Sequence, residues 1–162
     1  RMPAVAAVNG VAAGAGSSLA MSCDIVVAAP AASFIQAFSK IGLIPDAGGT
    51  FLLAHRLGLA RATALAMTGD KLSAAQAKEW GVVWEVAEDC VAAAEALAQR
   101  LAAMPTQALV RTRHLLRDAM TSSFEAQLQA ERDAQSALAK THDYFEGVTA
   151  FLEKRAPVFK GA

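Results

Sequence analysis

The sequence has little of what several common classes of function require. It contains two cysteines, Cys23 and Cys90, and two isolated thiols form neither a disulfide framework nor a paired-cysteine metal site. Lysine plus arginine (15) and aspartate plus glutamate (15) give a formal net charge of zero, so no overall field attracts nucleic acid or an anionic membrane. We therefore expect neither of these partners, and the free thiols favour a reducing cytoplasmic location.

The usual fingerprints of nucleotide, metal and serine-nucleophile sites are also missing. There is no GxGxxG, GxxxxGK[ST], HExxH or GxSxG segment, so Ser17 and Ser18 are poor nucleophile candidates. His55, His114 and His142 lack the spacing of metal ligands, and we predict that they are surface or interface residues. We expect no cofactor and no metal. No apolar run is long enough to cross a bilayer, and no signal-peptide pattern is visible.

What is present is a folded α/β pattern. The 162 residues are 54% hydrophobic, which is enough apolar surface for a core. In the first half, strand-like and helix-like segments alternate as they do in βαβ units, which predicts an α/β fold. The predicted strands are residues 5–8, 24–28, 33–36 and 82–86, and the predicted helices are 14–21, 50–56 and 61–67.

Helical patterns dominate the second half. Apolar residues recur at three- and four-residue steps in 89–104 and again, less cleanly, from Leu109 to Ala119, with Pro105 between them. Two capping boxes are predicted, one from Ser73 to Gln76 and one from Ser122 to Glu125. The second would open a helix that runs to about residue 140. Its apolar face is thin, so it is either a subunit interface or a solvated helix, and we favour the interface.

The segment from Asn9 to Asp24 is rich in glycine and alanine. A turn at Asn9-Gly10 leads into a helix near Gly14, whose first N–H groups have no partner inside the helix and carry the positive end of its dipole. Such groups can bind an oxyanion, and a well-aimed donor contributes about 3 kcal/mol. Close packing of the helix also requires small residues, and composition by itself favours that alternative.

Asp46 lies in a second glycine-containing segment, residues 41–50, before a predicted helix. One interpretation is local, because aspartate at this place commonly caps the helix or forms an Asx turn. The other is catalytic, because a carboxylate on an apolar loop can act as general base and acid. Its apolar neighbours would be Ile41, Leu43, Ile44, Phe51 and Leu52. The residues alone weigh the two interpretations equally.

Several segments together resemble the crotonase superfamily, which contains enoyl-CoA hydratases and isomerases. The matching signatures are residues 3–10, 14–24, 41–50, 71–82 and 150–159, in the superfamily's order, and they extend over essentially the whole chain. The sequence opens on a strand that must be buried by neighbours, and members of the superfamily have a further N-terminal section. We therefore expect such a section to precede Arg1.

The resemblance implies an α/β ββα-spiral core, present in part in residues 1–103, followed by a helical region in residues 104–162 used for trimerisation. Dimers of trimers are common in the superfamily. It also implies an acyl-CoA thioester substrate whose carbonyl oxygen occupies an oxyanion hole. One donor of that hole would be the Ala15 N–H, and the other would lie upstream of Arg1.

The resemblance further implies substrate contacts in both parts of the chain. In the core these are Gly14, Phe38, Ala47 and Gly49. Phe151 and Lys154 match tail residues that approach the CoA of a neighbouring subunit. By composition alone, Phe151 is a core residue and Lys154 is a solvated charge.

Departures from the family pattern bear on the reaction. Hydratases of the superfamily use two glutamates to position and activate water, and the matching residues here are Ser18 and Phe38, neither of which is a general base. Asp46 stands where hydratases usually have glycine, as in the 2-(1,2-epoxy-1,2-dihydrophenyl)acetyl-CoA isomerases of the phenylacetate pathway. The resemblance thus implies an isomerase of enoyl-CoA or ring-epoxide substrates, in phenylacetate or fatty acid metabolism, with Asp46 as its acid and base.

Two alternatives remain at this stage. The chain could keep the fold and act as a hydratase or thioester hydrolase, with Asp46 activating water. It could also be an inactive fragment, or an assembly subunit that oligomerises through its helical half, because it has only one of the two oxyanion donors.

Overall fold

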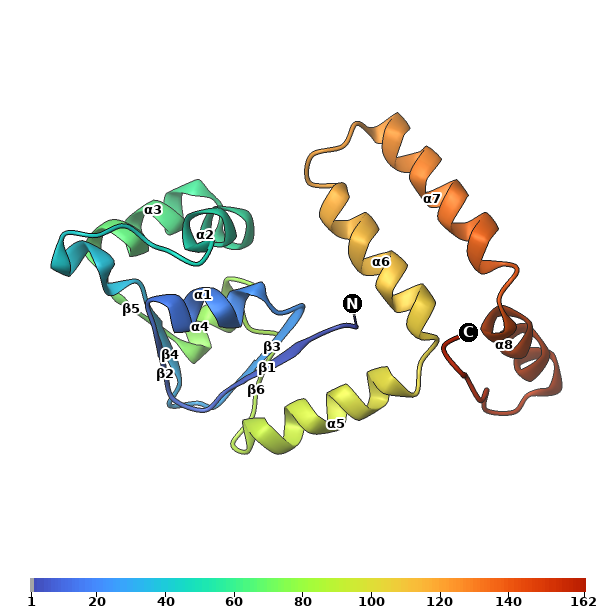
Figure 1. Ribbon diagram of the computed structural model, residues 1–162. Helices are drawn as coiled ribbons and strands as arrows, with labels where there is room; N and C mark the ends of the chain where they lie inside the picture. The colour runs from blue at the N-terminus through green and yellow to red at the C-terminus, as the bar shows by residue number, and fades with distance from the viewer. Residues whose placement is uncertain (1) are drawn as a thin grey trace. The chain divides into compact units, whose positions relative to one another are not determined.

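The computed structural model describes residues 2–162 and divides them into two compact units, each of which is described by itself (Figure 1). The first unit is Ala4–Leu97 and contains all the strands. The second unit is helical and consists mainly of Ala98–Ala162. Within the described residues, no helix has the length and apolar character needed to cross a membrane.

The first unit is built on two three-stranded sheets. One sheet has the order β1 (Val5–Val8), β3 (Ile25–Ala28), β6 (Glu85–Val86), with all strands parallel. The other has the order β2 (Val11–Ala13), β4 (Ser33–Ile35), β5 (Lys71–Ser73), and β5 is antiparallel to β4. β1 is thus hydrogen-bonded to β3 in one sheet, and β2 to β4 in the other. The central strand β3 reads as a continuous apolar run because both of its faces are covered.

The predicted α/β core is confirmed, with differences at short strands. The predictions for residues 5–8, 24–28 and 33–36 match β1, β3 and β4, whereas β2 and β5 were missed. Three-residue strands carry too few residues for a period of two to stand out. The predicted strand 82–86 is wrong over its first three residues. Val82 and Val83 are buried, yet only Glu85 and Val86 pair with a neighbour, so burial rather than pairing explains that apolar run.

The helices of this unit cover its strands and form its core (Figure 1). Helix α1 (Ala15–Ser22) packs against β1, β2 and α2 (Gly49–Leu57), and a short 3-10 helix, η1 (Ala37–Ile41), packs against α3 (Leu59–Thr68). The helix α4 (Ala74–Glu79) begins with the predicted capping box, in which Ser73 and Gln76 bond each other's backbone. The largest fully buried side chains are Met21, Leu53, Leu72, Val26, Val27 and Val82.

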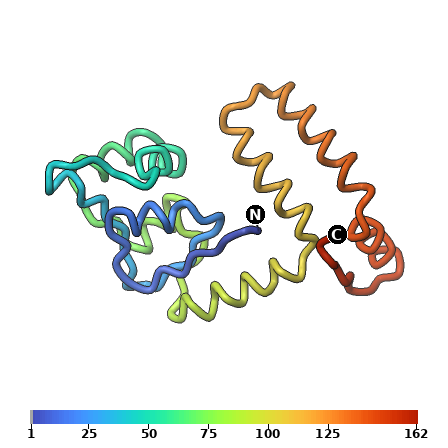
Figure 2. The backbone as a smooth tube through the Cα atoms, viewed as in Figure 1, coloured from blue at the N-terminus to red at the C-terminus, as the bar shows by residue number. Residues whose placement is uncertain are grey.

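The second unit contains a helical hairpin. After α5 (Cys90–Ala102), α6 (Thr106–Asp118) and α7 (Phe124–Leu138) run side by side, as the tube in Figure 2 shows. The predicted second capping box is wrong by one residue: Ser123 is the N-cap and accepts from Ala126, whereas Ser122 donates to the carbonyl of Asp118. The predicted α6 stripe is also wrong in part, because Leu116 is 67% exposed.

The last helix holds the C-terminal tail. Helix α8 (His142–Glu153) is capped by Thr141, and two of its carboxylates bond the backbone that follows it. The buried Asp143 accepts from the N–H groups of Lys160 and Gly161 at 2.8 Å each. Glu146 accepts from Arg155 and from the N–H of Val158. The hydrogen bond from the Lys160 backbone N–H lowers the pKa of Asp143, and the hydrogen bond from the Arg155 side chain lowers that of Glu146 to about 2.

Candidate active site

The N-terminal tip of α1 presents unpaired backbone donors. Gly14 precedes the helix with φ 54°, and its N–H donates to the carbonyl of Ile35 at 2.8 Å, which ties the turn to β4. Ser17 and Ser18 donate back to the carbonyl of Gly14. Within residues 2–162, the exposed Ala15 and Gly16 have no acceptor for their N–H groups. These two donors, at the positive end of the helix, are what an oxyanion requires.

Phe38 closes one side of this turn. A Cβ built on Gly14 would lie 3.2 Å from Cζ of the Phe38 ring, so the ring contacts the backbone at the tip of the helix. Gly14 is thus required both by its left-handed φ and by this close approach. The predicted neighbours Gly14, Ala15 and Phe38 come together, and the side that Phe38 forms is apolar.

The loop carrying Asp46 enters α2 through a left-handed turn. Ala47 has φ 49° and Gly48 has φ 78°, and the carbonyl of Asp46 accepts from the N–H of Gly49 at 2.7 Å. The residue at the N-cap is Gly48, and no side chain caps the helix. The helix-cap form of the local interpretation is therefore wrong, because the Asp46 carboxylate does not cap α2.

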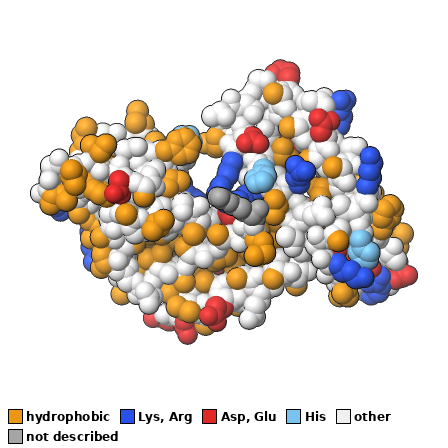
Figure 3. Space-filling view, in the orientation of Figure 1, with side chains coloured by type: hydrophobic (Ala, Val, Ile, Leu, Met, Phe, Trp, Pro, Cys, Tyr) orange, Lys and Arg blue, Asp and Glu red, His pale blue; other side chains and the backbone are white. Residues whose placement is uncertain are grey.

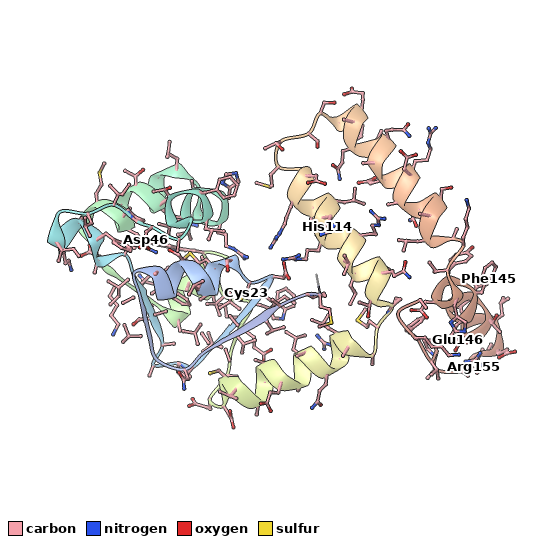
Figure 4. The ribbon with its side chains drawn as sticks, in the orientation of Figure 1. Cys23, Asp46, His114, Phe145, Glu146 and Arg155 are labelled. Carbon is pink, nitrogen blue, oxygen red and sulfur yellow. The ribbon has the colours of Figure 1, made fainter. Side chains whose placement is uncertain are left out.

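Gly49 brings this loop onto α1. A Cβ at Gly49 would lie 2.7 Å from Ser18 Oγ and 3.1 Å from Cβ of Pro45, so only glycine fits there. Ser18 is three residues beyond Ala15, about 4.5 Å along the helix axis, and Gly49 is three residues beyond Asp46. Figure 4 shows Asp46 beside α1. The loop that carries Asp46 thus packs on α1 through Gly49, close to the start of both helices.

The hydrocarbon expected around Asp46 is not formed within residues 2–162. Asp46 is exposed, and so are its apolar neighbours Ile41 (71%), Ile44 (77%) and Phe51 (61%). Figure 3 shows hydrophobic side chains gathered on the surface of this part of the first unit. The expectation failed because these side chains point away from the core that Leu53 and Leu57 of the same segment fill.

Sequence analysis missed a buried polar cluster under the site. Ser17 and Ser18 are fully buried and Gln36 is 3% exposed, and the Gln36 amide donates to Ser17 Oγ at 3.2 Å. Among the described residues, Ser18 Oγ and Gln36 Oε1 have no hydrogen-bond partner. The available signal was a lone glutamine at the end of the apolar segment of β4.

The remaining predicted residues lie in the second unit. Phe151 is 82% exposed on α8, and Lys154 ends that helix with φ 56°. Phe151 lines an apolar groove together with Tyr144, Val148 and Leu152, among others. Phe151 is therefore not the core residue that composition indicates.

The histidines and cysteines form no further site. His55, His114 and His142 are all exposed, as predicted, and the residues from 2 onward contain no cluster of three or more His, Cys, Asp or Glu side chains able to bind a metal. Cys90 is buried, whereas Cys23 is half-buried.

Comparison with known proteins gives the family. Residues 1–162 match the model of the enoyl-CoA hydratase/isomerase family. The chain is 51% identical over 161 residues to the 1,2-epoxyphenylacetyl-CoA isomerase of Escherichia coli K12, covering 98% of this chain and 62% of that protein. It is 43% identical to a "probable enoyl-CoA hydratase" of Rhodobacter capsulatus, covering 99% of this chain and 63% of that protein.

Solved structures agree. An enoyl-CoA hydratase from Polaromonas sp. JS666 superposes with a TM-score of 0.94 at 40% identity, covering 98% of this chain and 62% of the other. The chain thus spans a little under two thirds of the length of these relatives. The expected fold class, a crotonase-like ββα spiral followed by a helical region, is confirmed, and the chain belongs to the enoyl-CoA hydratase/isomerase family.

Proposed function

We propose that this chain carries the acid/base half of an acyl-CoA isomerase site, in which Asp46 transfers a proton within an enolate held at the tip of α1. The observation that carries the proposal is the close approach of Gly49 to Ser18. It brings the Asp46 loop, whose carboxylate caps no helix, against α1, whose Ala15 and Gly16 N–H groups are unpaired among the described residues. A base and an oxyanion donor at one site are the parts that proton transfer next to a thioester needs.

In the proposed reaction, the Asp46 carboxylate removes a proton from a carbon of the acyl chain. The C–H electron pair moves into the conjugated system, and the thioester oxygen takes the negative charge. The Ala15 N–H stabilises that oxygen, since a donor aimed at charge that develops in the transition state lowers the barrier. Asp46 then returns the proton at another carbon, so the double bond moves and no proton is gained or lost. With a ring-epoxide substrate, the same group would assist ring opening.

The residues at the two positions where hydratases of the superfamily have glutamates favour isomerisation over hydration. Ser18 is buried and Phe38 packs on Gly14, so neither supplies a base to activate water. One carboxylate is sufficient for an isomerase because the proton that leaves is the proton that returns. The 51% identity to an epoxyphenylacetyl-CoA isomerase supports the same choice.

The substrate and assembly belong to the proposal as well. We propose an acyl-CoA thioester whose acyl group covers the exposed apolar residues around Asp46. We also propose a homotrimer or dimer of trimers formed through the second unit, in which Phe151 and Lys154 approach the CoA of a neighbouring copy. The exposure of Phe151 is consistent with a role outside the core of its own unit.

Hydration is the second candidate, favoured by two observations. Two proteins described as enoyl-CoA hydratases are 43% and 40% identical to this chain over the matched residues. Asp46 is also exposed to water. Assays of crotonyl-CoA hydration and 3-enoyl-CoA isomerisation on the same full-length protein distinguish the two reactions.

The test of the proposed function is Asp46→Asn in the full-length protein. We expect isomerase turnover to fall about 10²–10⁴-fold, the usual contribution of a general base, while CoA affinity and thermal stability stay close to wild type. Asp70→Asn is the matched control, because Asp70 is an exposed aspartate of the same unit, outside the site. Full turnover in Asp46→Asn would rule out the assignment.

A further inference from the structure

The contact between the Asp46 loop and α1 is closer than helix packing requires. Gly49 is the first residue of α2, and its φ is not in the left-handed region, so the backbone would accept any side chain. What forbids one is chiefly Ser18 Oγ, 2.7 Å from where a Cβ would lie, with Cβ of Pro45 next at 3.1 Å. An alanine would otherwise be preferred to glycine inside a helix.

The surface under Gly49 is polar and buried. Ser18 is fully buried, and its Oγ has no partner among the described residues; the Gln36 Oε1 atom is likewise buried and unpaired, 3.8 Å from the same Cβ position. Buried unpaired oxygens are costly, so a fold normally avoids them. Here Ser18 Oγ fills the place where a side chain on Gly49 would begin, and Gln36 Oε1 lies next to it.

We propose that Ser18 and Gln36 are positioning residues that seat Gly49 on α1 and thereby set the distance of Asp46 from the oxyanion donors. This inference rests on the proposed function. Ser18 is well placed for it because it lies one helical turn from Ala15 on the same helix. Gln36 is held in place by its bond to Ser17 Oγ. A displacement of the loop by even a fraction of an ångström would misalign Asp46 with the acyl carbons.

The test is a double-mutant cycle in the full-length protein. Gly49→Ala adds a methyl group against Ser18 Oγ, and we expect kcat to fall about tenfold or more while KM stays within about twofold. Ser18→Ala removes the hydroxyl, and we expect a smaller fall, about threefold, again in kcat. In the double variant the missing hydroxyl makes room for the methyl group, so kcat should exceed that of Gly49→Ala alone. A merely structural role would change stability without this rescue.

The controls separate the possible failures. Gly10→Ala adds a methyl group that meets no atom within 4 Å and should leave kcat unchanged. The positioning role of Ser18 is disproved if Gly49→Ala keeps full kcat, or if the kcat of the double variant does not exceed that of Gly49→Ala. Should Gly49→Ala not fold, Ser18→Ala is the deciding variant. A lower kcat at constant KM supports the positioning role, and a wild-type kcat overturns it. If Asp46→Asn is inactive and the rescue is missing, only this inference fails; if Asp46→Asn is active, the proposed function fails.

Discussion

At the scale of single residues, one predicted substrate contact in each unit has an unusual backbone conformation. Ala47 and Lys154 are non-glycine residues in the left-handed region, with φ 49° and 56°, and both are predicted substrate contacts. Such conformations cost free energy, and they persist where the surrounding structure imposes them. Ala47 directly follows Asp46, so the turn that aims the carboxylate is held in a strained conformation.

Substitutions at Ala47 should report that strain. Glycine relieves the left-handed strain but gains entropy in the unfolded chain, so we expect Ala47→Gly to change the free energy of unfolding by less than about 1 kcal/mol. Valine, being β-branched, should destabilise by about 1–3 kcal/mol. Urea denaturation measures both. As a control, Ala60 is an exposed residue of α3, and Ala60→Val should lower the free energy of unfolding only by the helix-propensity difference, about 0.5 kcal/mol. Equal stability of the two variants at position 47 would argue against strain.

At the scale of elements, the helices differ in how their N-termini are capped. The N-terminus of α1 is capped by glycine and leaves its N–H groups free, whereas α4, α7 and α8 are capped by Ser73, Ser123 and Thr141. A side-chain cap would occupy the donors that an oxyanion needs. α2, α3 and α6 also begin without a side-chain cap, so a free N-terminus is shared by several helices, and α1 is the one that the proposed mechanism uses.

The cap of α7 can be tested with adjacent serines. Ser123→Ala removes the oxygen that accepts from Ala126, and we expect a loss of about 1 kcal/mol in the stability of this helix. Ser122→Ala, one residue earlier, removes no cap and should stay within about 0.5 kcal/mol. Hydrogen exchange of the first amides of α7 measures the difference. A larger effect for Ser122→Ala would restore the sequence-based position of the cap.

At the scale of the whole molecule, the predicted contacts are divided between two units. Asp46 and Ala15 belong to Ala4–Leu97, and Phe151 and Lys154 belong to the helical unit. In that unit, Glu146 and Arg155 lie together in Figure 4, where α8 meets the C-terminal tail. The tail directly follows Phe151 and Lys154, so its attachment to α8 bears on where these residues can lie.

The attachment of the tail should depend on pH. The hydrogen bond from Arg155 lowers the pKa of Glu146 from 4.5 to about 2. The backbone N–H of Lys160 is the main cause that lowers the pKa of Asp143. His142 lies next to Asp143, and Glu153 also bonds Arg155. Since the folded values are depressed, the stabilisation is complete above about pH 4.5 and is lost as the pH falls towards about 2.

Hydrogen exchange of the Val158 and Lys160 amides, measured between pH 5 and pH 2, follows this loss. We expect protection to decline through that range once the intrinsic pH dependence of exchange is removed. Glu146→Gln should weaken the protection of the Val158 amide already at neutral pH, because Val158 donates to Glu146. Unchanged protection down to pH 2 in the wild type would contradict the attachment.

Much of this architecture follows from local sequence. The apolar run of β3, the Ser73–Gln76 capping box and the glycine-rich entry to α1 each encode their element through side chains only a few residues apart. That Ser18 and Phe38 stand where hydratases have glutamates is implied by the resemblance to the superfamily, and Asp46 is read from the sequence directly. Local periodicity and turn chemistry act over one or two turns of chain, so the sequence is sufficient for them.

Contacts between distant segments were decided only by the tertiary structure. The fit of Gly49 on Ser18, the packing of Phe38 on Gly14, and the buried Gln36 all join residues on different elements. The exposure of Ile41, Ile44 and Phe51 was also decided there, because which face of a loop meets the core depends on the elements around it. Packing is a property of shape in three dimensions, and no spacing along the chain encodes it.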